Sequence, residues 1–229
     1  MLIFFTALIT FLASHMLVSR TRLKPWIVKR VGHNNYLLLY SGISLALLWW
    51  LIHAARIAPR VPLWPWVHGL YWIPNLVMPL ACILLVSGFV VPNPFSIATH
   101  SHGFNPEKPG LIIALTRHPI LWGFFLWALS HLIVNGEFPL AFMFLIFMIM
   151  SLLGIPLLDH RKRREIGVDS WTHMAKNTHS IIFCGRALRS GKFRLTKLDI
   201  AGIIIGLVLY VIAFLAHQTL FGINPTPPF

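Results

Sequence analysis

The amino-acid sequence predicts an all-α fold, a polytopic bundle of about six transmembrane helices. Of the 229 residues, 57% are hydrophobic and 11% are charged, and the mean hydropathy is +0.74. A soluble domain of this length could not bury so much apolar surface. The apolar residues also gather in runs of roughly 17 to 22, the length that a helix needs to cross a hydrocarbon core of ~30 Å. We therefore expect a single membrane domain over residues 1–229.

The first three spans lie in the first 91 residues. Leu2–Val18 has no basic leader before it, so we expect a retained helix rather than a signal peptide. The second span is Tyr36–Ile57. Residues 58–74 are rich in Pro and Trp, which suits a loop at the level of the lipid headgroups. The third span is Asn75–Val91, and Pro92 ends it.

The other three spans follow a polar connection. A short turn at Leu111–Leu115 leads to the fourth span, which opens at Pro119, because the first turn of a helix does not need the missing N–H of proline. Asn135-Gly136 is a helix stop. The fifth span is Phe138–Leu158, stopped by the charged run that follows, and the sixth is Asp199–Leu220.

The distribution of positive charge predicts the topology. Seventeen Lys and Arg follow the first, third and fifth spans, and only Arg56 and Arg60 lie on the other side. Cytoplasmic loops carry such an excess, so both termini are expected in the periplasm. The net charge of +13 is thus an orientation signal. We expect membrane lipids rather than nucleic acid as its partner.

Four histidines lie inside apolar spans or near their ends, where an ionisable side chain is a candidate functional residue. They are His15, His53, His131 and His217. The sequence has no Ser–His–Asp spacing, glycine-rich phosphate loop or carboxylate pair. Imidazoles with few acids suit haem b better than a hydrolytic zinc ion. The alternative for any single histidine is a packing role, with its ring hydrogen-bonded to a neighbouring helix.

Arg117 and His118 stand directly before the fourth span. We expect both at the cytoplasmic membrane surface, where they would bind haem propionates, lipid headgroups or a cofactor phosphate. The planar, permanently charged guanidinium of Arg117 suits such anions. The alternative is an ordinary anchor whose charged head reaches the headgroup layer.

Several motifs resemble those of the NnrU family, and together they cover nearly the whole chain. They are His15 with Ser19-Arg20, Gly32, Tyr40, Thr116-Arg117-His118-Pro119, Leu126 to Leu132, Asn135-Gly136-Glu137, Asp159-x-Arg161, Gly167, Trp171, His217, Gly222 and Pro225. The resemblance implies a multi-pass protein of the bacterial inner (cytoplasmic) membrane, associated with nitrite and nitric oxide metabolism in denitrification. The family is similar to plant zeta-carotene isomerase, which uses haem b with two histidine ligands. The resemblance to this family therefore implies that His15 and His131 are metal ligands.

A more distant resemblance is to isoprenylcysteine carboxyl methyltransferases, through Arg117-His118-Pro119 and Gly123. Those enzymes place an aromatic residue where this chain has Leu121. They also carry acidic residues after a later helix, where this chain has Arg161 to Arg164. Both departures disfavour methyl transfer.

Helix geometry ranks the candidate haem ligands differently from the resemblance. At 1.5 Å per residue, His15 lies ~20 Å from the periplasmic boundary and His131 ~6 Å from it. Two axial ligands must meet one iron, so they should lie at similar heights in the membrane. By the same arithmetic His53 and His217 lie at the height of His131. We therefore rank His131 first, His15 next by resemblance, then His217 and His53 by height.

The predicted function is a haem b protein with redox or isomerase-type chemistry on a small or lipophilic substrate. Two alternatives stay open. One is a membrane methyltransferase that binds S-adenosylmethionine near Arg117 and His118. The other is a non-catalytic accessory factor for a respiratory complex.

Overall fold

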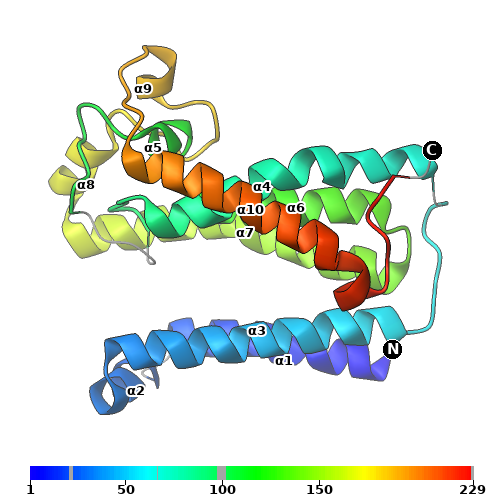
Figure 1. The fold of residues 1–229 in the computed structure, drawn as a ribbon. Coiled ribbons are helices and arrows are strands. Elements are labelled where there is room, and N and C mark those ends of the chain that lie inside the picture. The colour runs from blue at the N-terminus through cyan, green and yellow to red at the C-terminus, as the bar shows by residue number, and fades with distance from the viewer. Residues whose placement is uncertain (21–22, 66, 97–101, 228–229) are drawn as a thin grey trace. The chain divides into compact units, whose positions relative to one another are not determined.

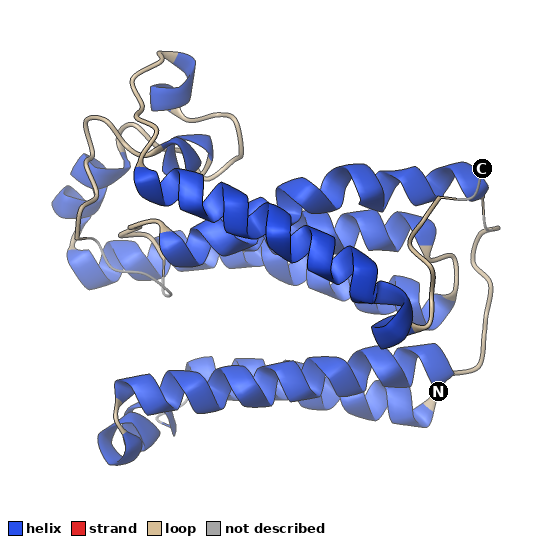
Figure 2. Ribbon diagram, in the orientation of Figure 1, coloured by secondary structure: helices blue, strands red, loops and turns tan. Residues whose placement is uncertain are grey.

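A computed structural model of the protein consists almost entirely of helices and loops (Figure 2). It describes all 229 residues apart from 21–22, 66, 97–101 and 228–229. Within this described part, β-type pairing is limited to two isolated bridges, so the predicted all-α class is confirmed. The chain divides into two compact units. The first comprises Met1–Pro65 and Asn135–Met143, and the second comprises Trp66–Val134 and Phe144–Phe229.

The first unit is built on a helical hairpin of α1 (Leu2–Arg20) and α3 (His33–Ile57), with the short helix α2 (Leu23–Val31) between them (Figure 1). Gly32 joins α2 to α3 with a φ of +85°, a conformation that favours glycine. Small side chains alternate with large ones in the buried seam of this unit, which lets the helices approach closely. The buried residues include Phe4, Ala7, Leu8, Phe11, Leu51, Ala54 and Ala55.

The first part of the Pro- and Trp-rich stretch, up to Pro65, belongs to the same unit and pairs with the turn around Gly136. The amide of Phe138 donates to the carbonyl of Val61 at 2.8 Å, and that of Leu63 donates to the carbonyl of Gly136 at 2.7 Å. A Cβ at Gly136 would collide with the carbonyl oxygen of Trp64, so this crossing requires glycine. The stretch that was expected to be only a headgroup-level loop is therefore tied to the chain at residues 136–138.

The second unit is organised around α4 (Trp72–Val90), which packs against α6 (Pro119–Val134) on one side and α10 (Lys197–Phe221) on another. Glycines make both contacts close. A Cβ at Gly123 of α6 would lie 2.9 Å from the carbonyl oxygen of Ala81, and one at Gly206 of α10 would lie 2.5 Å from the Cα of Ile83. Such small-residue contacts are typical of membrane helices.

Helix α7 (Phe138–Ile166) continues eight residues beyond Leu158, so the predicted end of the fifth span is wrong as a helix boundary. The charged run extends the helix instead of stopping it. Glu165 pairs with Arg161 at 2.7 Å and with Lys162 at 3.1 Å, at the spacings where helical side chains meet. This extension carries Asp159 past the start of α6.

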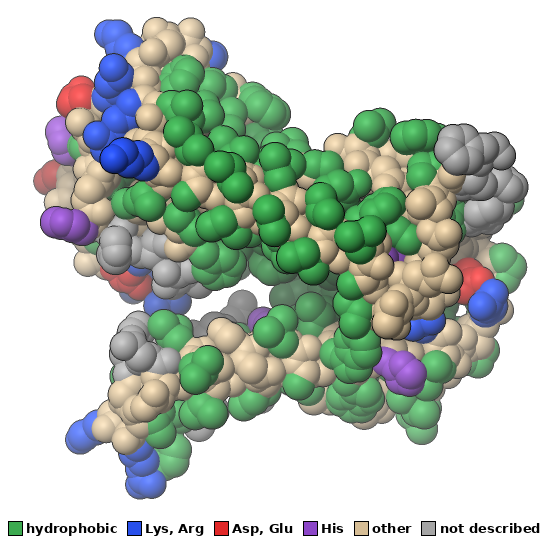
Figure 3. Space-filling model, viewed as in Figure 1, with side chains coloured by type: hydrophobic (Ala, Val, Ile, Leu, Met, Phe, Trp, Pro, Cys, Tyr) green, Lys and Arg blue, Asp and Glu red, His purple; other side chains and the backbone are tan. Residues whose placement is uncertain are grey.

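Short helices and loops form a polar end on the second unit. They include α5 (Leu111–Leu115), α8 (Val168–Ala175) and α9 (Arg186–Arg189), while the 3-10 helix η1 (His68–Tyr71) precedes α4. Asp199 is fully buried there and caps α10 together with Thr196. Its carboxylate also accepts from the amides of Leu111 and Ile112, at 3.3 and 3.1 Å, at the start of α5. Figure 3 shows Lys and Arg side chains gathered at this end and hydrophobic side chains along α10.

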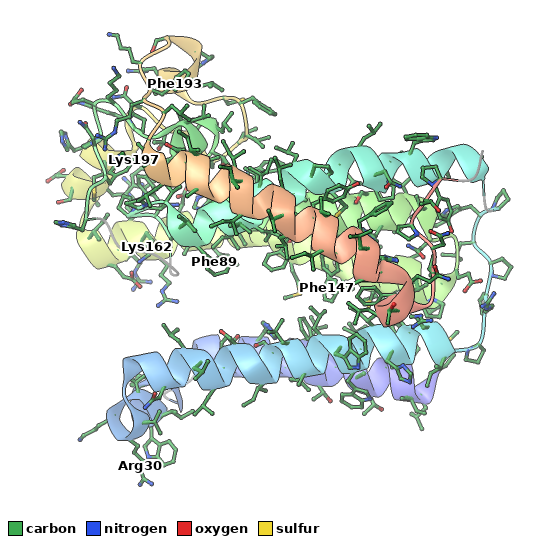
Figure 4. The ribbon with its side chains drawn as sticks, viewed as in Figure 1. Arg30, Phe89, Phe147, Lys162, Phe193 and Lys197 are labelled. Atoms are coloured by element: carbon green, nitrogen blue, oxygen red, sulfur yellow. The ribbon has the colours of Figure 1, made fainter. Side chains whose placement is uncertain are left out.

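Among the described residues, four helices are long and apolar enough to cross a membrane, namely those over Asn35–Ile57, Gly69–Val90, Phe138–Ile166 and Lys197–Phe221. Leu2–His15 and Pro119–Val134 are shorter apolar helices. Large apolar side chains point outward from the long helices, as Phe89 of α4 does with 60% of its surface exposed (Figure 4). The helical membrane class is thus supported, while six spans and periplasmic termini stay predictions.

Candidate functional site

The backbone before α6 is held in place by two residues that are distant in sequence and by one bond within the segment itself. The amide of Arg117 donates to the carbonyl of His179 at 3.0 Å. The side-chain amide of Asn93 donates to the carbonyl of Arg117 at 2.9 Å. The hydroxyl of Thr116 accepts from the amide of His118 at 3.2 Å. Thr116, Arg117 and His118 are all buried, so this segment is part of the core rather than an exposed loop.

Asp159 of α7 binds both candidate side chains of this segment. The guanidinium of Arg117 donates through Nε, at 3.0 and 3.1 Å to the two carboxylate oxygens, and through Nη2 at 2.6 Å. The imidazole Nε2 of His118 lies 2.9 Å from Oδ1 of Asp159. A forked, charge-assisted pair of this kind fixes orientation as well as position. Sequence reasoning missed Asp159 as a site residue, because its charge was assigned to the end of a span.

Aromatic rings enclose the guanidinium of Arg117. Its central carbon lies 5.1 Å from the ring centre of Trp171 on α8 and 5.7 Å from that of Phe95. The guanidinium carbon of Arg163 lies 5.8 Å from the Trp171 ring. Contacts between cations and aromatic faces are favourable, and more so away from water. Trp171 therefore ties α8 to the start of α6 and to the extended end of α7.

Two polar atoms near this pair are buried without a hydrogen-bond partner. They are Nδ1 of His118 and Nε1 of Trp171, and the described residues supply a bond to neither. A carboxylate can only accept a hydrogen bond. Nε2 of His118 therefore carries a proton and donates a hydrogen bond to Asp159. Nδ1 of a neutral imidazole is then a proton acceptor. The arrangement is a carboxylate-oriented imidazole able to exchange a proton at Nδ1, beside an arginine whose charge Asp159 balances.

His131 and His15, the two top-ranked ligand candidates, have matching surroundings although they belong to different units. Nδ1 of His131 lies 2.9 Å from the carbonyl oxygen of Trp127, four residues earlier, and Nδ1 of His15 lies 2.9 Å from that of Phe11. The serine before each histidine, Ser130 or Ser14, donates to the same carbonyl at 3.0 or 2.8 Å. A carbonyl can only accept, so Nδ1 carries the proton and Nε2 the lone pair in both rings.

Aromatic side chains pack against both imidazoles. The ring centre of His131 lies 5.2 Å from that of Phe144. The ring centre of His15 lies 4.2 Å from that of Phe11 and 5.8 Å from that of Tyr40. Each of these histidines therefore has apolar walls inside its own unit.

His217 and His53 differ from this pattern. Nδ1 of His217 on α10 lies 2.8 Å from the carbonyl oxygen of Ile223, six residues later in the chain. His53 on α3 is exposed. The described part of the chain has no group of three or more His, Cys, Asp or Glu side chains placed to hold a metal ion.

The long apolar helices, their glycine contacts and the buried Arg–His–Asp cluster define a helical protein of the membrane class. The family model described as NnrU protein matches residues 3–225, so the chain belongs to the NnrU family. The resemblance inferred from the motifs is confirmed. No curated protein and no solved structure was found to match the chain.

Proposed function

We propose that the protein binds haem b in the bacterial inner membrane and that His131 and His15 would hold its iron. The bound haem would supply redox or isomerase-type chemistry on a small or lipophilic substrate, linked to nitrite and nitric oxide metabolism. The observation that carries this proposal is the Ser–His geometry shared by Ser14-His15 and Ser130-His131.

A haem ligand needs its imidazole in one tautomer, with the lone pair on the nitrogen that meets the iron. Histidines that bind metals usually donate their other N–H to a carbonyl or carboxylate, which fixes the ring and raises its basicity. Trp127 and Phe11 supply this carbonyl to His131 and His15. The surrounding aromatic rings also suit an apolar macrocycle, so the residues present fit the group.

Arg117 and His118 are proposed to bind an anionic group of the cofactor or a lipid. Asp159 uses Nε and Nη2 of the guanidinium and Nε2 of the imidazole. An anion would therefore bind through Nη1 of Arg117, and through Nδ1 of His118 when that nitrogen is protonated. In this proposal Asp159 positions both side chains and keeps the cluster close to neutral.

An absorption spectrum of the purified protein in detergent tests the proposal. We expect a Soret band that shifts on reduction, lost in His131→Ala and His15→Ala. It should persist in the matched control His173→Ala, because His173 is exposed on α8. Haem loss in His131→Ala together with His217→Ala or His53→Ala, but not His15→Ala, would replace His15 as the second ligand.

Two other results would overturn the proposal. Full haem retention in His131→Ala would remove the primary ligand. A protein that stays colourless after expression with added haem would favour the methyltransferase or the accessory factor. Binding of S-adenosylmethionine, measured by calorimetry on the same sample, would then separate those two.

A further inference from the structure

Residues 179–183 form a strap that crosses the start of α6. Besides the bond from the Arg117 amide to His179, the hydroxyl of Thr116 and the indole N–H of Trp122 both donate to the carbonyl of Ser180, at 3.1 and 2.7 Å. The amide of Phe183 donates to the carbonyl of Leu115 at 2.9 Å. The inner side of the strap is thus fully engaged with α5 and α6.

The outer side of the strap presents two large apolar side chains. Ile181 is 52% exposed and Phe183 is 56% exposed. Phe183 has a φ of +64°, and it is the one non-glycine residue with positive φ in the described part of the chain. A bulky side chain in this conformation strains the backbone, and a glycine would avoid this strain. The fold therefore holds an apolar tip outward against the local preference of the backbone.

The segment of sequence around the strap carries only positive charge, and one of its lysines, Lys176, pairs with Glu107 from another segment. Residues 170–198 contain six Lys and Arg and no Asp or Glu. Arg186, Arg189 and Lys192, which follow the strap, are exposed. Apolar tips among basic side chains are the pattern of surfaces that bind anionic membranes. The strap is also bonded to the first residues of an apolar helix, the level at which such a helix meets the headgroup layer.

We propose that the strap is an interfacial anchor. Ile181 and Phe183 insert into a leaflet that contains anionic phospholipids, and Arg186, Arg189 and Lys192 bind its phosphates. Because the strap also holds the amide of Arg117, the leaflet braces the Arg117–His118 segment from outside. This inference does not depend on haem binding.

Site-directed spin labelling in nanodiscs tests the anchor. Labels are placed at Phe183→Cys, Ile181→Cys and the control Lys192→Cys in a Cys184→Ser background, where Cys82 is buried and out of reach. In discs containing phosphatidylglycerol, we expect collisions with oxygen to outweigh those with a water-soluble nickel chelate at 181 and 183, with the reverse at 192. In phosphatidylcholine discs, the ratio of oxygen collisions to nickel collisions at 181 and 183 should fall toward the ratio at 192.

Readings at 181 and 183 as aqueous as that at 192 in the anionic discs would overturn the anchor and favour a protein partner. Equal readings at 181 and 183 in both lipids would overturn the role of lipid charge. Phe183→Gly gives a second test in an unlabelled protein. It should raise the unfolding temperature in detergent by relieving the backbone, yet lose stabilisation by phosphatidylglycerol. Undiminished stabilisation by this lipid would also overturn the anchor.

Discussion

Helix α6 carries a histidine near each end, and the two have opposite surroundings. His118, directly before the helix, donates from Nε2 to a carboxylate, and its Nδ1 has no partner among the described residues. His131, near the other end, gives Nδ1 to a carbonyl of its own helix and lies among aromatic rings. The same residue type thus becomes a candidate proton acceptor at one end and a candidate iron ligand at the other, depending on which ring nitrogen is fixed.

The two ends also differ in how far apart in sequence their contacts lie. The carbonyl that orients the His131 ring belongs to Trp127, one helical turn away. The bonds that orient Arg117 and His118 come from Asp159, His179 and Asn93, each at least 24 residues away. Substitutions far away in the sequence should therefore perturb the Arg117–His118 segment. The surroundings of His131 should depend mainly on substitutions within α6 itself.

The largest effect is expected for Asp159→Asn, which would break the polar end. The substitution leaves the guanidinium of Arg117, whose side chain is only 10% exposed, without its counter-charge. Removing one partner of a buried ion pair should lower the free energy of unfolding by about 3 kcal/mol. Denaturant unfolding in detergent measures it. The control Glu165→Gln, on the exposed end of the same helix, should cost far less, and equal losses would contradict the comparison.

A smaller effect is expected for Gly123→Ala, between the two ends of α6. The added methyl group would press on the carbonyl of Ala81 and the side chain of Leu85, at a cost of about 2 kcal/mol. The matched control is Gly42→Ala on α3, where the new Cβ meets nothing within 4 Å. Alanine should stabilise that helix slightly. Thermal unfolding of both variants should show shifts of opposite sign.

Ser130→Ala probes the apolar end more gently. The variant loses the hydroxyl that shares the Trp127 carbonyl with His131, but it keeps the bond to Nδ1. We expect haem to be retained with its affinity weakened by about 1 kcal/mol or less. Ser14→Ala should give a similar change, measured by haem titration. A loss as complete as that in His131→Ala would show that serine does more than orient the ring.

The smallest effect is expected for the surface ion pair at the polar end. A hydrogen bond from Lys176 holds the pKa of the Glu107 carboxyl below its ordinary value. Its stabilisation is therefore present above the ordinary pKa and disappears as the pH falls through the lower, folded-state pKa. Glu107→Gln should lower the unfolding temperature slightly at pH 7 and not in strong acid. A drop at pH 7 as large as that of Asp159→Asn would erase the contrast between buried and exposed pairs.

Sequence reasoning succeeded where a boundary depends on local chemistry. The start of α6 at Pro119 and its end before Asn135 both follow from residues at the boundary itself. It failed at the end of α7, because a charged run predicts a membrane boundary and not a helix boundary. Pairs such as Arg161–Glu165 extend the helix into the polar region.

The same distinction explains what was found of the candidate site. Arg117 and His118 were recognisable from their place before an apolar helix. Asp159 was not, since its partners lie 41 and 42 residues earlier and no local pattern links them. The signal available was the Asp159-x-Arg161 motif, which the family resemblance contained without a role. Helix α8 was missed because its basic surroundings were interpreted only as a topology signal.

The buried carboxylate of Asp199 has a consequence for the order of biogenesis. One side chain at the start of the last helix satisfies amides at the start of α5, 87 and 88 residues earlier. A nascent chain that ends before Asp199 has both amides unsatisfied and an open polar end. The start of α5 therefore acquires these two hydrogen bonds only after the start of the last helix has been synthesised.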